Sequence, residues 1–87
     1  NMPVEERLDS FIKEHPYISE KYSGEDLFRR HNILTGSCEM GRRAFCQDHG
    51  INPETDSFTV EEFIRLTCNA YGKDVIRQLA DRLSIKL

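Results

Sequence analysis

Apolar residues recur every three or four positions along most of the chain, which is the spacing of amphipathic helices. The first such stripe holds Val4, Leu8 and Phe11. Pro16 ends that helix because the residue before a proline avoids the helical region of backbone conformation. Helices are predicted over about 3–14, 24–32, 38–49, 60–71 and 74–84. The sequence therefore predicts an all-α fold, a small single-domain bundle of four or five short helices.

The number of helices depends on Gly72. The apolar stripe stays in phase across this residue, and one internal glycine costs a helix only about 1 kcal/mol, so a single long helix over 60–84 is an alternative. We favour a break at Gly72. Residues 17–22 are interpreted as one turn of helix and 52–57 as a loop. The sequence shows no alternating pattern long enough to predict a strand, and no internal repeat is evident.

Local signals place two helix starts. Thr59 and Glu62 have the spacing of a capping box, in which each side chain accepts a hydrogen bond from the backbone N–H of the other residue. Ser37 follows turn residues and is predicted to cap the third helix. The predicted core consists of Leu8, Phe11, Ile12, Leu27, Phe28, Ala44, Phe45, Phe63, Ile64, Leu79 and Leu83.

Size and composition narrow the possible functions. At 87 residues, of which 38% are hydrophobic, the chain forms one small core with little volume for a cofactor-sized cavity. No serine, histidine and acid arrangement or acidic pair is evident, and Cys38, near a predicted helix start, is only the best placed of the thiols. We expect no enzymatic activity, no catalytic residues and no cofactor.

The three cysteines form no CxxC pair, and their odd number suggests free thiols in a reducing compartment. We expect a cytoplasmic protein with no membrane span, because no apolar run approaches the roughly 18–20 residues that a span needs. Asn1, before Met2, is interpreted as a cloning remnant. Cys46 and His49 are weak metal candidates, but behaviour as a small hydrophobe is the ordinary role of a buried cysteine. No metal site is expected.

Charge makes nucleic acid the second choice of partner. Twelve basic against fifteen acidic residues give a net charge of −3, the wrong sign for binding that neutralises phosphates. The segment 27–49 is nevertheless basic. Its candidate contacts for an anion or a nucleic acid are Arg29, Arg30, Ser37, Arg42 and Arg43. A regulator that binds nucleic acid through a helix-turn-helix-like arrangement of this segment is the alternative function.

The favoured function is a small, non-enzymatic protein-interaction or regulatory module that acts through a helical surface. Leu66 falls off the apolar stripe of its helix, and Ile85 and Leu87 are apolar residues at the end of the chain. These three residues are the candidate partner surface. The partner is expected to be another protein or a second copy of this chain, as in a homodimer.

The capping box generates a first test. Thr59→Ala removes the side-chain oxygen that accepts the N–H of Glu62, and we expect a loss of about 1 kcal/mol in the free energy of unfolding. Urea denaturation of the two proteins measures this loss. An unchanged free energy of unfolding would show that Thr59 does not cap the helix.

Overall fold

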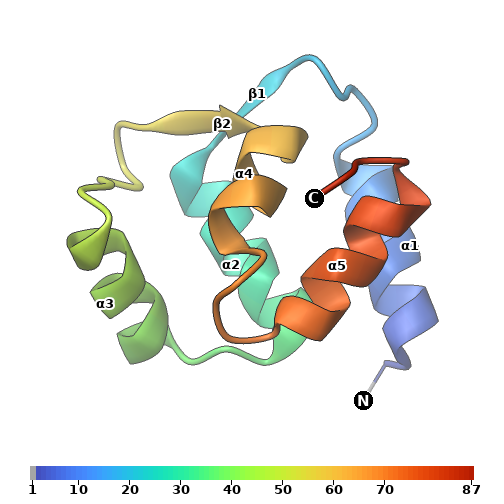
Figure 1. Cartoon of the computed structure of the whole chain (residues 1–87). Coiled ribbons are helices and arrows are strands. Elements are labelled where there is room, and N and C mark those ends of the chain that lie inside the picture. The colour runs from blue at the N-terminus through green and yellow to red at the C-terminus, as the bar shows by residue number, and fades with distance from the viewer. Residues whose placement is uncertain (1) are drawn as a thin grey trace.

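Five helices and one pair of very short strands make up the fold over residues 2–87, shown in Figure 1. The computed structural model describes residues 2–87, and Asn1, interpreted above as a cloning remnant, lies outside the described residues. The elements are α1 (Val4–Glu14), β1 (Lys21–Ser23), α2 (Gly24–Thr35), α3 (Glu39–Asp48), β2 (Ser57–Thr59), α4 (Val60–Thr67) and α5 (Lys73–Arg82). The mainly helical, small single-domain fold is confirmed.

The predicted break at Gly72 is present, so residues 60–84 form two helices. Gly72 has φ +80°, in the left-handed region that favours glycine, and α4 already ends at Thr67 rather than at residue 71. A side chain at position 72 would also collide with α2, because an added Cβ would lie 2.4 Å from the Cβ of Thr35. Gly72 therefore permits both the turn between the helices and its close contact with α2.

The two strands correct the prediction for residues 17–22, which form a tight hydrogen-bonded turn followed by a strand rather than a turn of helix. β1 and β2 pair antiparallel, with Tyr22 opposite Phe58 and Lys21 opposite Thr59. Each strand has only three residues and its partner lies far away in the sequence. No local apolar pattern of that length distinguishes a strand from a turn, which is why the pairing was not predicted.

An internal repeat, not evident in the sequence, relates the two halves of the chain. Residues 4–35, here the first unit, and residues 39–67, the second unit, both have the order helix, loop, strand, helix. In each unit a hydroxyl residue ends the strand and caps the second helix. Ser23 accepts the N–H of Asp26 at 3.1 Å, and Thr59 accepts the N–H of Glu62 at 3.0 Å.

The first helices of the two units share a second feature. In α1, the rings of Phe11 and His15 stack at 4.3 Å, and Nδ1 of His15 lies 2.9 Å from the carbonyl oxygen of Phe11. In α3, Phe45 and His49 do the same, at 3.9 Å and 2.8 Å. The loop of the second unit (49–59) is two residues longer than that of the first (15–23), so no single offset aligns the whole repeat. This change of offset conceals the repeat in the sequence.

The predicted capping box at the start of α4 is confirmed. The carboxylate of Glu62 accepts the backbone N–H of Thr59 at 2.8 Å, which completes the reciprocal pair of bonds. This backbone hydrogen bond is also the main reason that the pKa of the Glu62 carboxyl lies below its usual range. The box places the start of α4 directly after β2.

A second connection between the units lies at the start of α2. The first N–H groups of a helix have no partner within it. Here the N–H of Gly24 donates to the carbonyl of Asp56 at 2.8 Å, and that of Glu25 donates to the carbonyl of Pro53 at 2.9 Å. The loop of the second unit therefore caps the second helix of the first unit, and Gly24 is buried beneath it.

The core lies where α2 and α4 meet α1 and α5. Phe63 is fully buried; its ring stacks against Phe11 and meets the ring of Phe28 edge to face. The buried apolar residues are Leu8, Phe11, Leu27, Phe28, Leu34, Cys46, Val60, Phe63, Ile64, Ile76, Leu79, Ala80 and Ile85. Of the predicted core residues, Ile12, Phe45 and Leu83 are only half-buried, and the prediction is wrong for Ala44, which is exposed.

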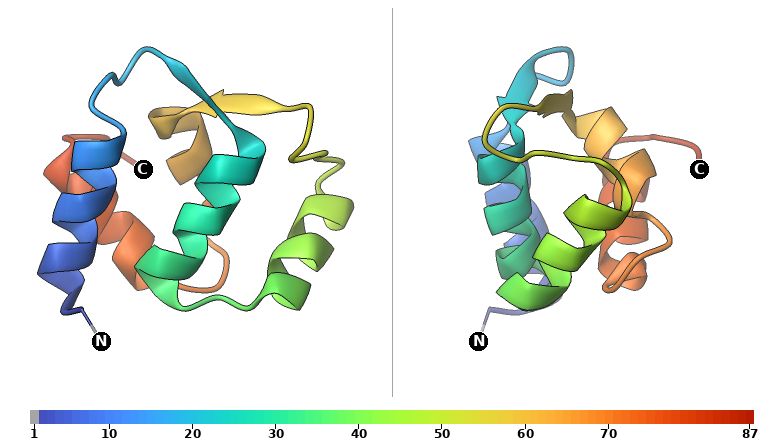
Figure 2. Two further views of the ribbon diagram at one scale, coloured as in Figure 1. Left: turned by 180° about the vertical axis from the view of Figure 1, so that it is seen from behind. Right: turned by 90° about the vertical axis from the view of Figure 1, so that its left-hand side faces the viewer.

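α3 is the least covered helix. Of its ten residues only Cys46 is buried, whereas α5 packs against α4 and α2 and its Arg82 reaches Glu5 and Asp9 of α1 at 3.0 and 2.7 Å. Figures 1 and 2 place α3 on the opposite side of the molecule from α1 and α5. Ala44 is exposed because no other helix covers that face of α3.

Nothing in the helices described, over residues 2–87, has both the length and the apolar character needed to cross a membrane.

The contact between Gly24 and the loop yields a prediction. An added Cβ at Gly24 would lie 3.0 Å from the Cα of Pro53 and 3.1 Å from the carbonyl oxygen of Asp56. We expect Gly24→Ala to lower the free energy of unfolding by about 1–3 kcal/mol, because backbone on both sides must move apart. Urea denaturation measures the change.

Gly41→Ala is the matched control. Gly41 lies inside α3, and an added Cβ there meets only the thiol of Cys38, at 3.3 Å. We expect this change to be neutral or to stabilise by up to about 1 kcal/mol, since alanine is the better helix former. Equal effects of the two substitutions would contradict the proposed role of Gly24.

Candidate functional site

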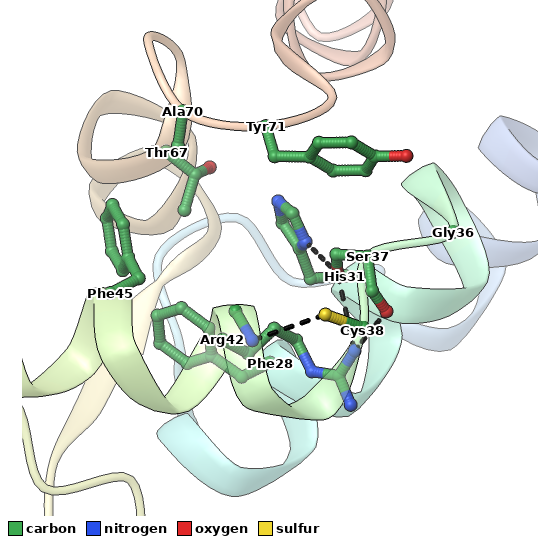
Figure 3. A pocket seen from close by; sticks show the side chains of 11 residues that line it. Phe28, His31, Gly36, Ser37, Cys38, Arg42, Phe45, Thr67, Ala70 and Tyr71 are labelled. Carbon is green, nitrogen blue, oxygen red and sulfur yellow. Dashed lines mark hydrogen bonds between the residues drawn. The ribbon is translucent and has the colours of Figure 1, made fainter.

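An open apolar cavity of about 320 Å³ lies between α2, α3 and the connection from α4 to α5 (Figure 3). Most of its lining consists of carbon atoms. The lining residues are Phe28, His31, Gly36, Ser37, Cys38, Gly41, Arg42, Phe45, Thr67, Ala70 and Tyr71. We call this cavity the α3 groove. Its volume lies at the lower end of the range of small-molecule sites in proteins.

The α3 groove exists because α3 stands away from the rest of the fold. Phe45 of α3 is half-buried and reaches Phe28 of α2 with ring centroids 6.0 Å apart. Beyond this contact the facing position on α3 is Gly41, which has no side chain to fill the space. On the opposite wall Tyr71 is 69% exposed. The groove is therefore apolar inside and open to solvent.

His31 is a buried polar residue within this lining. The side chain is 4% exposed, and its Nδ1 lies 2.7 Å from Oγ of Ser37. The other ring nitrogen, Nε2, is buried and has no hydrogen-bond partner within residues 2–87. Figure 3 shows that this edge of the ring points into the space between Thr67 and Tyr71. A buried polar atom without a partner is uncommon and costs stability, so it marks this position.

His31 is uncharged at neutral pH. Burial, and to a smaller extent the nearby positive charge of Arg42, together lower the pKa of His31 to about 4. A buried imidazole loses the water that would stabilise its charged form. The ring therefore offers one N–H donor and one acceptor rather than two donors.

Ser37 and Arg42, two of the predicted anion contacts, bind each other. The guanidinium of Arg42 donates to both the carbonyl and the hydroxyl oxygen of Ser37. Cys38, rather than the predicted Ser37, is the N-cap of α3, and its sulfur accepts the N–H of Gly41 at 3.3 Å. The hydroxyl of Ser37 is instead buried beside His31.

The other predicted anion contacts pair with acidic residues. Arg29 reaches Asp26 at 2.7 Å, Arg30 reaches Glu14 at 3.5 Å and Asp26 at 3.9 Å, and Arg43 reaches Glu39 at 3.4 Å. Arg29 and Arg43 are exposed. The positive charge of these arginines is therefore largely offset by adjacent carboxylates.

The three residues predicted as a partner surface lie in different environments. Leu66 is half-buried against the core, and Ile85 is a core residue that is only 8% exposed. Leu87 is 54% exposed. The structure therefore offers only Leu87 of these three as a freely exposed apolar side chain.

The weak metal candidates, Cys46 and His49, also lie in different environments. Cys46 is buried, and burial raises the pKa of its thiol. His49 is on the surface, with Nδ1 at 2.8 Å from the carbonyl of Phe45. Within residues 2–87 no three side chains of histidine, cysteine, aspartate or glutamate come together as a metal site.

The repeated helix–loop–helix unit invites a test against calcium-binding loops of the EF-hand type. Such loops have twelve residues, with oxygen ligands at positions 1, 3 and 5 and a glutamate at position 12. If Glu62 is position 12, the three early positions hold Ile51, Pro53 and Thr55. The Glu62 carboxylate accepts the N–H of Thr59. This loop does not supply the carboxylate set of such a site.

The loop of the first unit differs in the same way. If Asp26 is position 12, His15, Tyr17 and Ser19 hold positions 1, 3 and 5. The Asp26 carboxylate is paired with Nε2 of His15 at 2.8 Å and with Arg29. In both units the acidic residue of the second helix closes its own loop.

Comparison of the chain with protein-family models, with curated proteins and with solved structures found no match.

His31 was not predicted as a site residue from the sequence, although a signal for it is present. Leu27, Phe28 and Leu34 surround it at helical spacing, so His31 falls on the apolar face of α2. A polar residue in such a position needs a buried hydrogen-bond partner. Ser37, six residues later, supplies that partner for one nitrogen only.

The lowered pKa of His31 makes stability depend on pH. The pKa of an unfolded histidine is about 6.5, so the unfolded chain takes up a proton at this site more readily than the folded chain does. The stabilisation is complete above pH 6.5 and is lost as the pH falls toward 4. Between pH 7 and pH 5 we expect His31 to account for a loss of about 2 kcal/mol.

Urea denaturation at the two pH values, for the natural chain and for His31→Gln, isolates this effect, because glutamine does not titrate. The variant is expected to lose about 2 kcal/mol less than the natural chain on the same change of pH. The same loss in both proteins would show that His31 keeps an ordinary pKa.

Proposed function

We propose that this protein is a non-enzymatic interaction module that binds an amphipathic helix of a partner protein in the α3 groove. The observation that supports this proposal is an asymmetry of the internal repeat. One helix, α5, packs on α4 and α2 and reaches α1 through ion pairs, whereas the related position, beside α3, is an open apolar cavity.

The repeat relates the surroundings of the two grooves. It exchanges α1 with α3 and α2 with α4, so the position related to that of α5 faces α2, the end of α4 and α3. These are the elements that line the α3 groove. His31 of α2 corresponds to Thr67 of α4 in this repeat, and both line the cavity.

α5 itself shows what such a groove holds. Its buried residues are Ile76, Leu79 and Ala80, spaced three and four apart, and its other face is largely exposed. An apolar stripe of this kind is how amphipathic helices bind in grooves of other proteins. We therefore infer a partner helix with two or three large apolar residues along one face.

The alternative function, nucleic-acid binding through segment 27–49, stays a prediction. Its arginines are engaged by Ser37 or by acidic residues. Cytoplasmic location and self-association also stay predictions.

A library of displayed 20-residue peptides designed as amphipathic helices, with varied apolar positions, tests the proposal. We expect the natural chain to enrich peptides that share apolar residues at positions i, i+3 or i+4, and i+7. Ala70→Phe places a ring in the α3 groove and is expected to weaken binding of these peptides at least about tenfold, since about 1.4 kcal/mol of contact is lost.

Ala44→Phe is the matched control, because Ala44 is exposed on α3 and does not line the groove. It should leave the affinity within about twofold, well below the tenfold change that 1.4 kcal/mol produces. Circular dichroism of both variants verifies that they fold. Failure to enrich any helical peptide family, or equal binding to the Ala70→Phe variant, would refute the proposal.

A further inference from the structure

The unpartnered nitrogen of His31 distinguishes the α3 groove from a purely apolar site. Nε2 is buried in the packing behind the cavity surface, points toward the space between Thr67 and Tyr71 (Figure 3), and has no acceptor or donor among the described residues. At the related position of the repeat, Thr67 donates its hydroxyl proton to the carbonyl of Phe63 at 2.9 Å and leaves no donor free. Among the described residues that line the groove, Nε2 of His31 is therefore the one buried side-chain nitrogen or oxygen without a hydrogen-bond partner.

The hydrogen bonds around Nδ1 decide which ring nitrogen carries the proton. The hydroxyl of Thr35 donates to the carbonyl of His31 at 2.8 Å, so its proton is already used. The hydroxyl oxygen of Ser37 receives an N–H of Arg42 at 3.3 Å, and Nδ1 of His31, at 2.7 Å, is the acceptor within reach of the Ser37 proton. The hydroxyl oxygen of Thr35 also lies 3.2 Å from Nδ1. Because the Ser37 hydroxyl has Nδ1 as its nearest acceptor, this arrangement favours Nδ1 as the acceptor, with the single proton of the neutral ring on Nε2.

We propose that the Nε2–H of His31 is the specificity determinant of the α3 groove and selects an occupant that carries a neutral oxygen acceptor, a carbonyl or a hydroxyl, beside its apolar group. For a partner helix, which rests on the proposed function, this means a glutamine, asparagine or tyrosine side chain among the apolar anchors.

The surroundings favour a neutral oxygen over a carboxylate. A carboxylate loses much more hydration on burial than a carbonyl does, and it needs several donors or a cation in return. The lining includes one charged side chain, Arg42, and Figure 3 shows its guanidinium turned toward Ser37 and Cys38 on the far side of the His31 ring. His31 alone supplies one hydrogen bond, which is enough for a carbonyl or a hydroxyl oxygen.

Three small probes of similar shape test this selection without a partner helix: cumene has no acceptor, acetophenone has a neutral acceptor, and benzoate has a carboxylate. Their dissociation constants are measured by NMR titration for the natural chain and for His31→Phe. Because cumene and acetophenone differ in their own hydration, the quantity compared is the ratio of their dissociation constants in each protein.

We expect His31→Phe to weaken the binding of acetophenone relative to that of cumene by about two- to tenfold, because one net hydrogen bond is lost. We also expect benzoate to bind the natural chain more weakly than acetophenone. An equal ratio in both proteins, or tighter binding of benzoate, would overturn the proposal.

A second measurement uses the natural chain alone, in case the substitution disturbs folding. Long-range ¹H–¹⁵N spectra of the imidazole report which nitrogen is protonated. The expected result is a proton on Nε2. The ¹H and ¹⁵N resonances of this N–H group are expected to shift when acetophenone binds, and to shift differently when cumene binds. A proton on Nδ1, or identical shifts with both probes, would refute the role of His31.

The outcomes separate this inference from the proposed function. Selection of acetophenone without any helical peptide binding would uphold the His31 donor and remove the partner helix. Binding of helical peptides without selection among the small probes would uphold the groove as a docking site and remove His31 as its determinant.

Discussion

The pairing of two three-residue strands is the constraint on which the rest of this structure depends. Opposing Tyr22 and Phe58 fixes the starts of α2 and α4 side by side, because each helix begins at the residue after its strand. The loop of the second unit adds two carbonyl groups that cap α2. A few backbone hydrogen bonds thereby orient two helices, and the orientation brings Phe63 between Phe11 and Phe28. Most of the apolar burial follows from this arrangement.

The two units then differ in what covers them. α1 and α5 close one side of the central pair of helices, with Ile76 and Leu79 fully buried, whereas α3 approaches the other side through little more than Cys46 and Phe45. Because helices cover the first unit more completely than the second, apolar surface stays exposed on the side of α3. The cavity and the unpaired nitrogen of His31 are both found on that side.

Local signals in the sequence predicted what local physics determines. Thr59 and Glu62 satisfy each other within four residues, and Gly72 adopts a backbone conformation that other residues disfavour, so the capping box and the helix break were foreseeable. The strands depend on pairing across more than thirty residues and were missed. Ala44 was assigned to the core because helical spacing shows which residues share a face, but not whether another helix covers that face. The groove could not be predicted for the same reason, although helical spacing does place His31 on the apolar face of α2.

Thr35 joins the covered side of the molecule to the open one. Its methyl group packs against Gly72, the residue before α5. Its hydroxyl oxygen accepts a hydrogen bond from the N–H of Ser37, and its hydroxyl group donates one to the carbonyl of His31. The side chain of Thr35 thus contacts the turn that leads into α5 and also holds the backbone of His31 in place. The position of α5 and the lining of the groove therefore depend on each other. A residue larger than glycine at position 72 would displace Thr35, and the displacement would reach His31 through the hydrogen bonds that Thr35 makes to the carbonyl of His31 and to Ser37.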